Sequence, residues 1–117
     1  MRLIERKMIA AIYERKDWKC DNTRVICTQF VHSDHIIDRV SVILHGSTIA
    51  IITPTDVDVS DCGYQTPTTK SRLNAILREF CGAGIYQKNH KWFACAEGEK
   101  DWEVRKGSRQ LFYRGEG

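Results

Sequence analysis

Residues 39–53, "RVSVILHGSTIAIIT", restrict the possible fold more than any other part of the chain. Two runs of β-branched and aliphatic residues flank a His45-Gly46-Ser47 turn, where the glycine supplies the backbone freedom that a tight turn requires. Pro54 stops the second run, because proline cannot donate a hydrogen bond to a neighbouring strand. The sequence therefore predicts a β-hairpin, and with it an antiparallel sheet.

Three other segments carry the pattern of strands. The run "TRVICTQFV" is rich in β-branched and aromatic residues, which favour extended structure. Asp56–Ser60, "DVDVS", alternates strictly, so Val57 and Val59 are expected to point inward from a half-exposed strand. The run "GIYQKNHKWFACA" predicts a second hairpin that turns at Asn89–His90.

Two segments have helical periodicity. Residues 2–16 place apolar side chains, among them Met8 and Ile12, on one face and charged side chains on the others. A second apolar stripe with spacing i, i+3, i+4 and i+7 is formed by Leu73, Ile76, Leu77 and Phe80. Gly82 or Gly84 is suited to the left-handed residue that ends such a helix.

These elements predict one α+β domain over residues 1–117, with an antiparallel sheet of about four to six strands and two packed helices. Residues 1–22 are expected to form the first helix and a turn, "DWKCDN". Residues 96–117 are the least regular part. They are expected to form a polar tail or loop in which "LFYRG" supplies a short final strand.

Composition excludes several classes of protein. An odd number of cysteines without a CxxC pair does not suit a disulfide scaffold, and favours reduced thiols in a cytosolic protein. No segment approaches the roughly 20 apolar residues that a membrane span needs, and the amphipathic start does not resemble a signal peptide. The net charge of +3 permits an anionic partner without requiring one.

The segment Gly63–Asn74, "GYQTPTTKSRLN", is the leading candidate for function. It predicts a helix start that is capped either by Thr66, with Pro67 in the first helical position, or by Thr68 or Thr69. Hydroxyl groups, unpaired N–H groups and two cations would then meet at the positive end of the helix dipole, as anion binding requires. The residues predicted to contact a ligand are Tyr64, Thr66, Thr68, Thr69, Lys70, Arg72 and, in the hairpin turn, His45.

A purely structural interpretation of the same segment remains open. Threonine and serine are good helix caps in any protein, and a cation misplaced at an exposed helix start costs only about 0.3–1 kcal/mol. Arg72 adjoins the apolar stripe, so it could lay its stem across the edge of the core and pair with Glu79 or with an acid on a strand.

Metal binding and catalysis have weaker support. Cysteine and histidine residues cluster in the first third of the chain, but their spacing does not suit zinc: Cys20, Cys27, His32 and His35. Cys62 with His45 could form a nucleophilic pair, although no recognised local motif surrounds them. Asp56 and Asp58 share a strand face and could hold magnesium, but a solvated face is the favoured explanation. No metal, cofactor or catalytic residue is therefore predicted.

Nucleic-acid or nucleotide binding is more plausible, because aromatic residues are interspersed with cations along the chain. The aromatic residues are Trp18, Tyr64, Trp92, Trp102 and Tyr113. The cations that could join Lys70 and Arg72 are Arg78, Lys88, Lys91, Arg105, Lys106, Arg109 and Arg114.

Four motifs, "NTRV", "VILHGSTIAII", "GYQTPTTKSRLNAIL" and "GIYQKNHKWF", together resemble a family of small uncharacterised bacteriophage-encoded proteins. Its members carry a Leu-His-Gly hairpin and a Gly-aromatic-x-Thr-x-Thr-Thr-Lys-x-Arg-Leu helix start. The resemblance covers roughly residues 18–95. It implies a phage origin and action in the host cytoplasm, without implying an activity.

Together, the residues and the resemblance predict a non-catalytic phage accessory protein that binds a phosphate-bearing ligand, either nucleic acid or a nucleotide. The alternative is an inhibitor that binds a host enzyme or an anti-phage defence complex, in the manner of an anti-CRISPR protein. That inhibitor would use the sheet face or the tail that contains Trp102. No membrane partner is expected, and a homodimer is possible.

Overall fold

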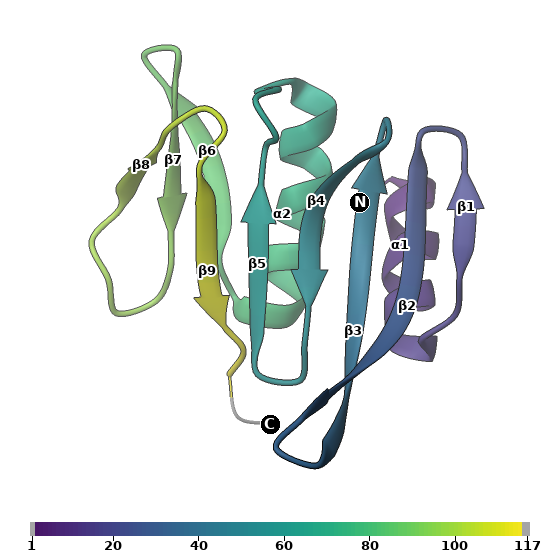
Figure 1. Cartoon of the computed structure of the whole chain (residues 1–117). Coiled ribbons are helices and arrows are strands. Elements are labelled where there is room, and N and C mark those ends of the chain that lie inside the picture. Colours follow the sequence, from purple (N-terminus) through teal and green to yellow (C-terminus); the bar gives the residue numbers. More distant parts are fainter. Residues whose placement is uncertain (1, 116–117) are drawn as a thin grey trace.

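In a computed structural model, which describes residues 2–115, the chain forms two helices and nine strands (Figure 1). The helices are α1 (Leu3–Glu14) and α2 (Pro67–Cys81). The strands are β1 (Trp18–Cys20), β2 (Thr23–His32), β3 (His35–Leu44), β4 (Ser47–Ile52), β5 (Asp56–Ser60), β6 (Gly84–Lys88), β7 (Lys91–Cys95), β8 (Trp102–Val104) and β9 (Arg109–Tyr113).

Six of these strands form one antiparallel sheet in the order β1-β2-β3-β4-β5-β9. The remaining three form a small antiparallel sheet in the order β6-β7-β8. Both helices lie on the same side of the large sheet (Figure 1). The predicted α+β class and single domain are confirmed, and the small second sheet is an addition that the sequence did not predict.

The hairpin β3–β4 is tight because His45 and Gly46 both adopt positive φ, 50° and 81°. Two consecutive residues with positive φ make the turn whose twist matches that of the flanking strands. Asn89 and His90 turn the β6–β7 hairpin in the same way, with φ of 51° and 63°. Both hairpins that the sequence predicted are present.

The start of α2 settles the choice between the predicted caps. Thr66 is the N-cap and accepts a hydrogen bond from the N–H of Thr69, while Pro67 occupies the first helical position. At the other end Gly82, in the left-handed region at φ 59°, ends the helix. The whole predicted apolar stripe of this helix is buried.

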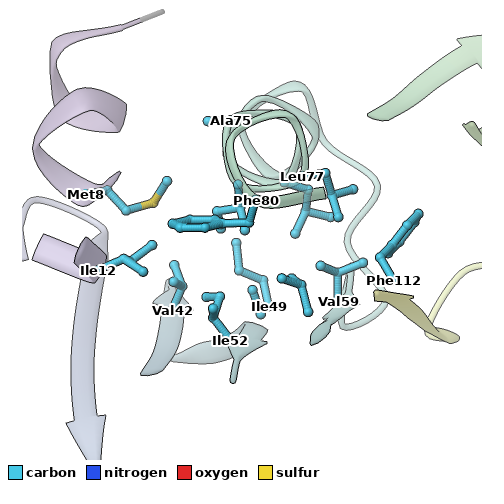
Figure 2. Close-up of a cluster of buried hydrophobic side chains, with 14 of the residues drawn as sticks. Met8, Ile12, Val42, Ile49, Ile52, Val59, Ala75, Leu77, Phe80 and Phe112 are labelled. Carbon is cyan, nitrogen blue, oxygen red and sulfur yellow. The ribbon is translucent and has the colours of Figure 1, made fainter. Parts of the chain in front are cut away.

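The core lies between the helices and the large sheet (Figure 2). Met8 and Ile12 of α1 and Leu77 of α2 pack toward sheet residues such as Val42 and Val59. Val57 and Val59 are fully buried, as their alternation predicted.

Both ends of the described chain are more regular than the sequence indicated. Trp18–Cys20, predicted as part of a turn, is the edge strand β1, and Asp21 at φ 50° supplies the turn instead. The predicted tail contributes β8 to the small sheet and β9 to the large one. Phe112 of β9 is buried and packs against Trp102, at 5.6 Å between ring centroids. Packing with residues distant in sequence thus orders segments whose own composition is polar.

Candidate functional site

The β3–β4 turn, the loop after β5 and the start of α2 lie at the same end of the molecule (Figure 1). Side chains of these three segments line a groove. Its volume is about 430 Å³. It is lined by Leu44, His45, Ser47, Ile49, Asp61, Tyr64, Thr66, Thr68 and Thr69. The first four come from the hairpin and the other five from the loop and helix start, so the groove joins two segments predicted separately.

Five of the seven residues that the sequence predicted to contact a ligand line this groove. They are His45, Tyr64, Thr66, Thr68 and Thr69. Tyr64, one of the lining residues, remains 64% exposed. Lys70 and Arg72 lie outside the lining.

The helix start keeps little capacity for an anion. Thr66 and Thr69 bond to each other, with their hydroxyl oxygens 2.9 Å apart, and the N–H of Thr69 donates to Thr66 at 3.1 Å. The N–H of Lys70 donates to the carbonyl of Thr66 at 3.0 Å, and Pro67 has no N–H. Among the N–H groups in the first turn of α2, only that of Thr68 takes part in none of these hydrogen bonds. The helix start is therefore largely capped by its own side chains.

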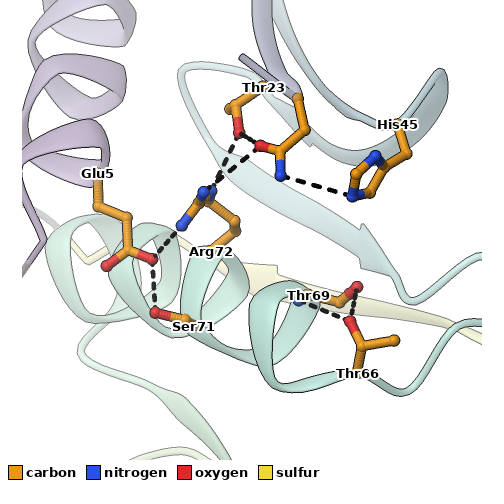
Figure 3. A network of polar contacts seen from close by, with 8 residues as sticks. Glu5, Thr23, His45, Thr66, Thr69, Ser71 and Arg72 are labelled. Carbon is orange, nitrogen blue, oxygen red and sulfur yellow. Dashed lines mark hydrogen bonds and ion pairs between the residues drawn. The ribbon is translucent and has the colours of Figure 1, made fainter. Parts of the chain in front are cut away.

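Arg72 is buried in a polar network that joins both helices to the sheet (Figure 3). Its side chain is 4% exposed, and its Nη1 lies 2.8 Å from Oε2 of Glu5 on α1. Its Nε donates to the hydroxyl of Thr23 at 3.0 Å, and Ser71 donates to the same Glu5 oxygen. An acid is thus the partner of Arg72, as the structural interpretation held, but the acid is Glu5 rather than Glu79 or a strand residue. We therefore leave Arg72 out of the proposed ligand contacts.

Burial acts to raise the pKa of Glu5, but the hydrogen bonds from Ser71 and Arg72 and the charge of Arg72 outweigh it. The net effect lowers the pKa of Glu5 below its ordinary value. The carboxylate is therefore held in its charged form, as the partner of a buried guanidinium must be.

The same network reaches the groove through the β1–β2 turn. Thr23 donates to the side-chain oxygen of Asn22 at 2.8 Å, and Asn22 Nδ2 lies 3.5 Å from Nε2 of His45 (Figure 3). The N–H of His45 donates to the carbonyl of Asn22 at 2.9 Å. Asn22 therefore holds the backbone of His45, and its amide lies beside the imidazole ring. Neither Glu5 nor Asn22 could be identified from local sequence, because their partners are distant.

Asp61 fixes the loop that forms the other wall. This carboxylate is 2% exposed and accepts hydrogen bonds from the N–H groups of Gly63 and Gly107, both at 2.7 Å, and from the Gln65 amide at 3.0 Å. Gln65 also donates to the carbonyl of Val104 at 3.0 Å. The sequence carried one signal, since an acid two residues before a glycine commonly forms such a turn.

The chemistry of the groove follows from this lining. It offers hydroxyl groups, one imidazole, an exposed aromatic ring, and an apolar floor of Leu44 and Ile49. Its one full charge is the carboxylate of Asp61, and no cation is among its lining residues. Such a groove suits an uncharged flat ring with polar edges better than it suits a phosphate group.

The metal and nucleophile sites considered from the sequence do not assemble in residues 2–115. No three His, Cys, Asp or Glu side chains gather there in a way that could hold a metal ion. The thiol of Cys62 donates to the carbonyl of Thr48 at 3.1 Å, rather than to His45. Asp56 accepts from Thr53 and Thr55.

Asp58, the second acid of the possible magnesium pair, lies 3.0 Å from Nη2 of Arg109. Its charge is thus already compensated by a protein cation. In the described part of the chain, neither helix is long and apolar enough to cross a membrane.

Comparison with known proteins gave one family. The family model described as Kyanoviridae Gp96 protein matches residues 1–115. Neither the curated proteins nor the solved structures contain a match to the chain.

Proposed function

The chain belongs to the Kyanoviridae Gp96 protein family and is thus a phage protein, and we propose that it acts by binding a nucleotide unit. In this proposal the base and sugar occupy the groove, and the phosphate lies outside it. The protein has a binding role and performs no chemistry on its ligand.

One observation carries this proposal: an exposed aromatic ring stands at the rim of a polar groove whose lining has no cation. In the proposal Tyr64, which is exposed and lines the groove, stacks on a base, a contact that nucleotide-binding surfaces use irrespective of base identity. The hydroxyl and N–H groups of Thr68, together with Ser47 and His45, are available for the polar edges of the base or the sugar. The carboxylate of Asp61 and the apolar floor disfavour a phosphate inside.

The proposal is tested by calorimetric titration with AMP, CMP and, as a probe without a base, ribose 5-phosphate. The Tyr64→Ala variant is expected to bind the mononucleotides about 5- to 150-fold more weakly, which corresponds to about 1–3 kcal/mol for one stacked base. Tyr113→Ala is the matched control, because Tyr113 is similarly exposed, at 73%, but lies on β9 away from the groove. Equal affinity of wild type and Tyr64→Ala, or equal binding of ribose 5-phosphate and AMP, would contradict the proposal.

A second function, inhibition of a host protein, is favoured by the long β2–β3 hairpin. Only Val40–Leu44 of β3 pairs with β4, and only Thr23–Val25 of β2 pairs with β1, so the far half of the hairpin extends past both neighbours. Val31 and Ile36 pair across its end and are 73% and 71% exposed. A protein partner that covered this end of the hairpin would remove both aliphatic side chains from water.

Affinity purification from a nuclease-treated host lysate tests this second function. A specific host protein that binds wild type and not the Val31→Lys/Ile36→Lys variant would support it. A Lys16→Ala/Lys19→Ala variant, changed at exposed residues away from the hairpin end, is the control. Retention of the same proteins by all three forms would count against it.

A further inference from the structure

Three cations and a histidine lie beside the groove, on the small sheet and the loop that follows it. His90 and Lys91 are at the β6–β7 turn, and Arg105 and Lys106 follow β8. These four residues, called the basic cluster below, line a shallow depression of about 420 Å³ together with Gln65 and Trp92. The β6–β7 turn, the loop after β8 and the start of α2 are at the same end of the molecule (Figure 1).

The charge of the basic cluster is not compensated by ion pairs within residues 2–115. The four ion pairs found there involve Arg15, Lys16, Arg72 and Arg109, and none involves Lys91, Arg105 or Lys106. All three are exposed, and one acid, Glu103, shares the depression with them. Cations that remain close together without acidic partners favour the approach of a polyanion.

The groove and the basic cluster are held together by named contacts. Gln65 lines the cluster, while its neighbours Tyr64 and Thr66 line the groove. Asp61 of the groove binds the N–H of Gly107, directly after the cluster, and Gln65 bonds both Asp61 and the carbonyl of Val104. These contacts fix the position of the basic cluster relative to the groove. The groove is polar with an aromatic rim, and the basic cluster beside it is cationic.

From this arrangement we infer that the ligand is single-stranded nucleic acid, with a base in the groove and the adjoining phosphates on the basic cluster. The inference rests on the proposed nucleotide function and extends it from a monomer to a polymer. A mononucleotide would leave most of the cluster unused, whereas a polymer presents a phosphate at every step. A single strand is required because the base must leave its stack to lie against Tyr64.

Fluorescence anisotropy with labelled oligothymidylate of about ten nucleotides tests this, in parallel with a duplex of the same length. Three phosphate contacts on a single strand reduce affinity about 20-fold between about 50 and 200 mM salt. The Lys91→Ala/Arg105→Ala/Lys106→Ala variant should bind the oligonucleotide at least tenfold more weakly and lose most of that salt dependence. Its affinity for AMP should stay within about twofold of wild type.

The control replaces one arginine and two lysines that are also exposed but lie on α1 and β1: Arg6→Ala/Lys7→Ala/Lys19→Ala. It removes the same charge, so an equal loss in both variants would overturn the inference in favour of non-specific attraction. Tighter binding of the duplex would also overturn it. Unchanged oligonucleotide binding in the cluster variant would overturn the polymer inference alone, whereas the AMP and Tyr64→Ala titrations decide the nucleotide function separately.

Discussion

Breaking the buried ion pair between Glu5 and Arg72 should destabilise the protein far more than breaking an exposed one. Both side chains are 4% exposed, and the nearest nitrogen and oxygen are 2.8 Å apart. Removing one partner leaves the other charge buried without compensation, which costs about 3–5 kcal/mol. The free energy of unfolding of a domain is about 5–15 kcal/mol. Glu5→Met or Arg72→Met alone should therefore remove a large fraction of the protein's stability.

The double variant Glu5→Met/Arg72→Met should recover most of that loss. An apolar pair of similar volume needs no compensating charge, so replacing both partners is often neutral or stabilising. Thr23 keeps its hydrogen bond to Asn22, so its buried hydroxyl is not left without a partner. We expect the double variant to lie within about 1–2 kcal/mol of wild type, which gives a coupling energy of at least about 2 kcal/mol.

The measurement is urea unfolding followed by circular dichroism, with the two single variants and the double variant as a cycle. The pair between Asp58 and Arg109 is the control, because its separation is 3.0 Å but its side chains are 31% and 55% exposed. Arg109→Met should cost less than about 1 kcal/mol. A loss below about 1 kcal/mol in both Glu5→Met and Arg72→Met would refute the reasoning that burial makes this pair different.

Three further predictions concern stability. Thr66→Ala should lower the free energy of unfolding by about 1 kcal/mol, because the N–H of Thr69 loses its cap. Thr66→Asn, whose side chain can also cap, should keep most of that stabilisation. Urea titrations measure both variants. Stability should fall as the pH drops below about 4.5, since the folded pKa of Glu5 is lowered and the unfolded state takes up the proton first; thermal melts of Glu5→Gln should lack that contribution. Ile76→Ala, at a fully buried position, should cost about 2–5 kcal/mol in urea, whereas Arg78→Ala on the exposed face of α2 should stay within about 0.5 kcal/mol.

Features that depend on neighbouring residues could be predicted from the sequence. The hairpin at His45-Gly46 and the start of α2 at Thr66-Pro67 are determined by turn geometry and capping, which act over a few residues. The same local signals located much of the groove, because its walls are that turn and that helix start. The hairpin β6–β7 and a short final strand at β9 were also predicted, but strand β8, the separate small sheet and the pairing of β9 with β5 were not, because they depend on partners distant in sequence.

The partners of the charged residues could not be predicted from the sequence for the same reason. Lys70 and Arg72 both stand at the helix start, but only the fold distinguishes them, since Arg72 bonds Glu5, which precedes it by 67 positions. Similarly, Asp61 could be recognised as a turn residue, but not as the acid that binds Gly107. Local sequence indicates where a polar side chain is placed, and long-range contacts determine its partner.

The position of β9 next to β5 has a consequence for the kinetics of folding. Asp56 of β5 pairs with Tyr113 of β9, so the two strands are neighbours in the large sheet. In the sequence, however, α2 and the entire small sheet separate them. Pairings between distant segments pay their loop-closure entropy before their contacts form, so they tend to come late in folding. Substitutions in β9 should therefore accelerate unfolding more than they slow folding.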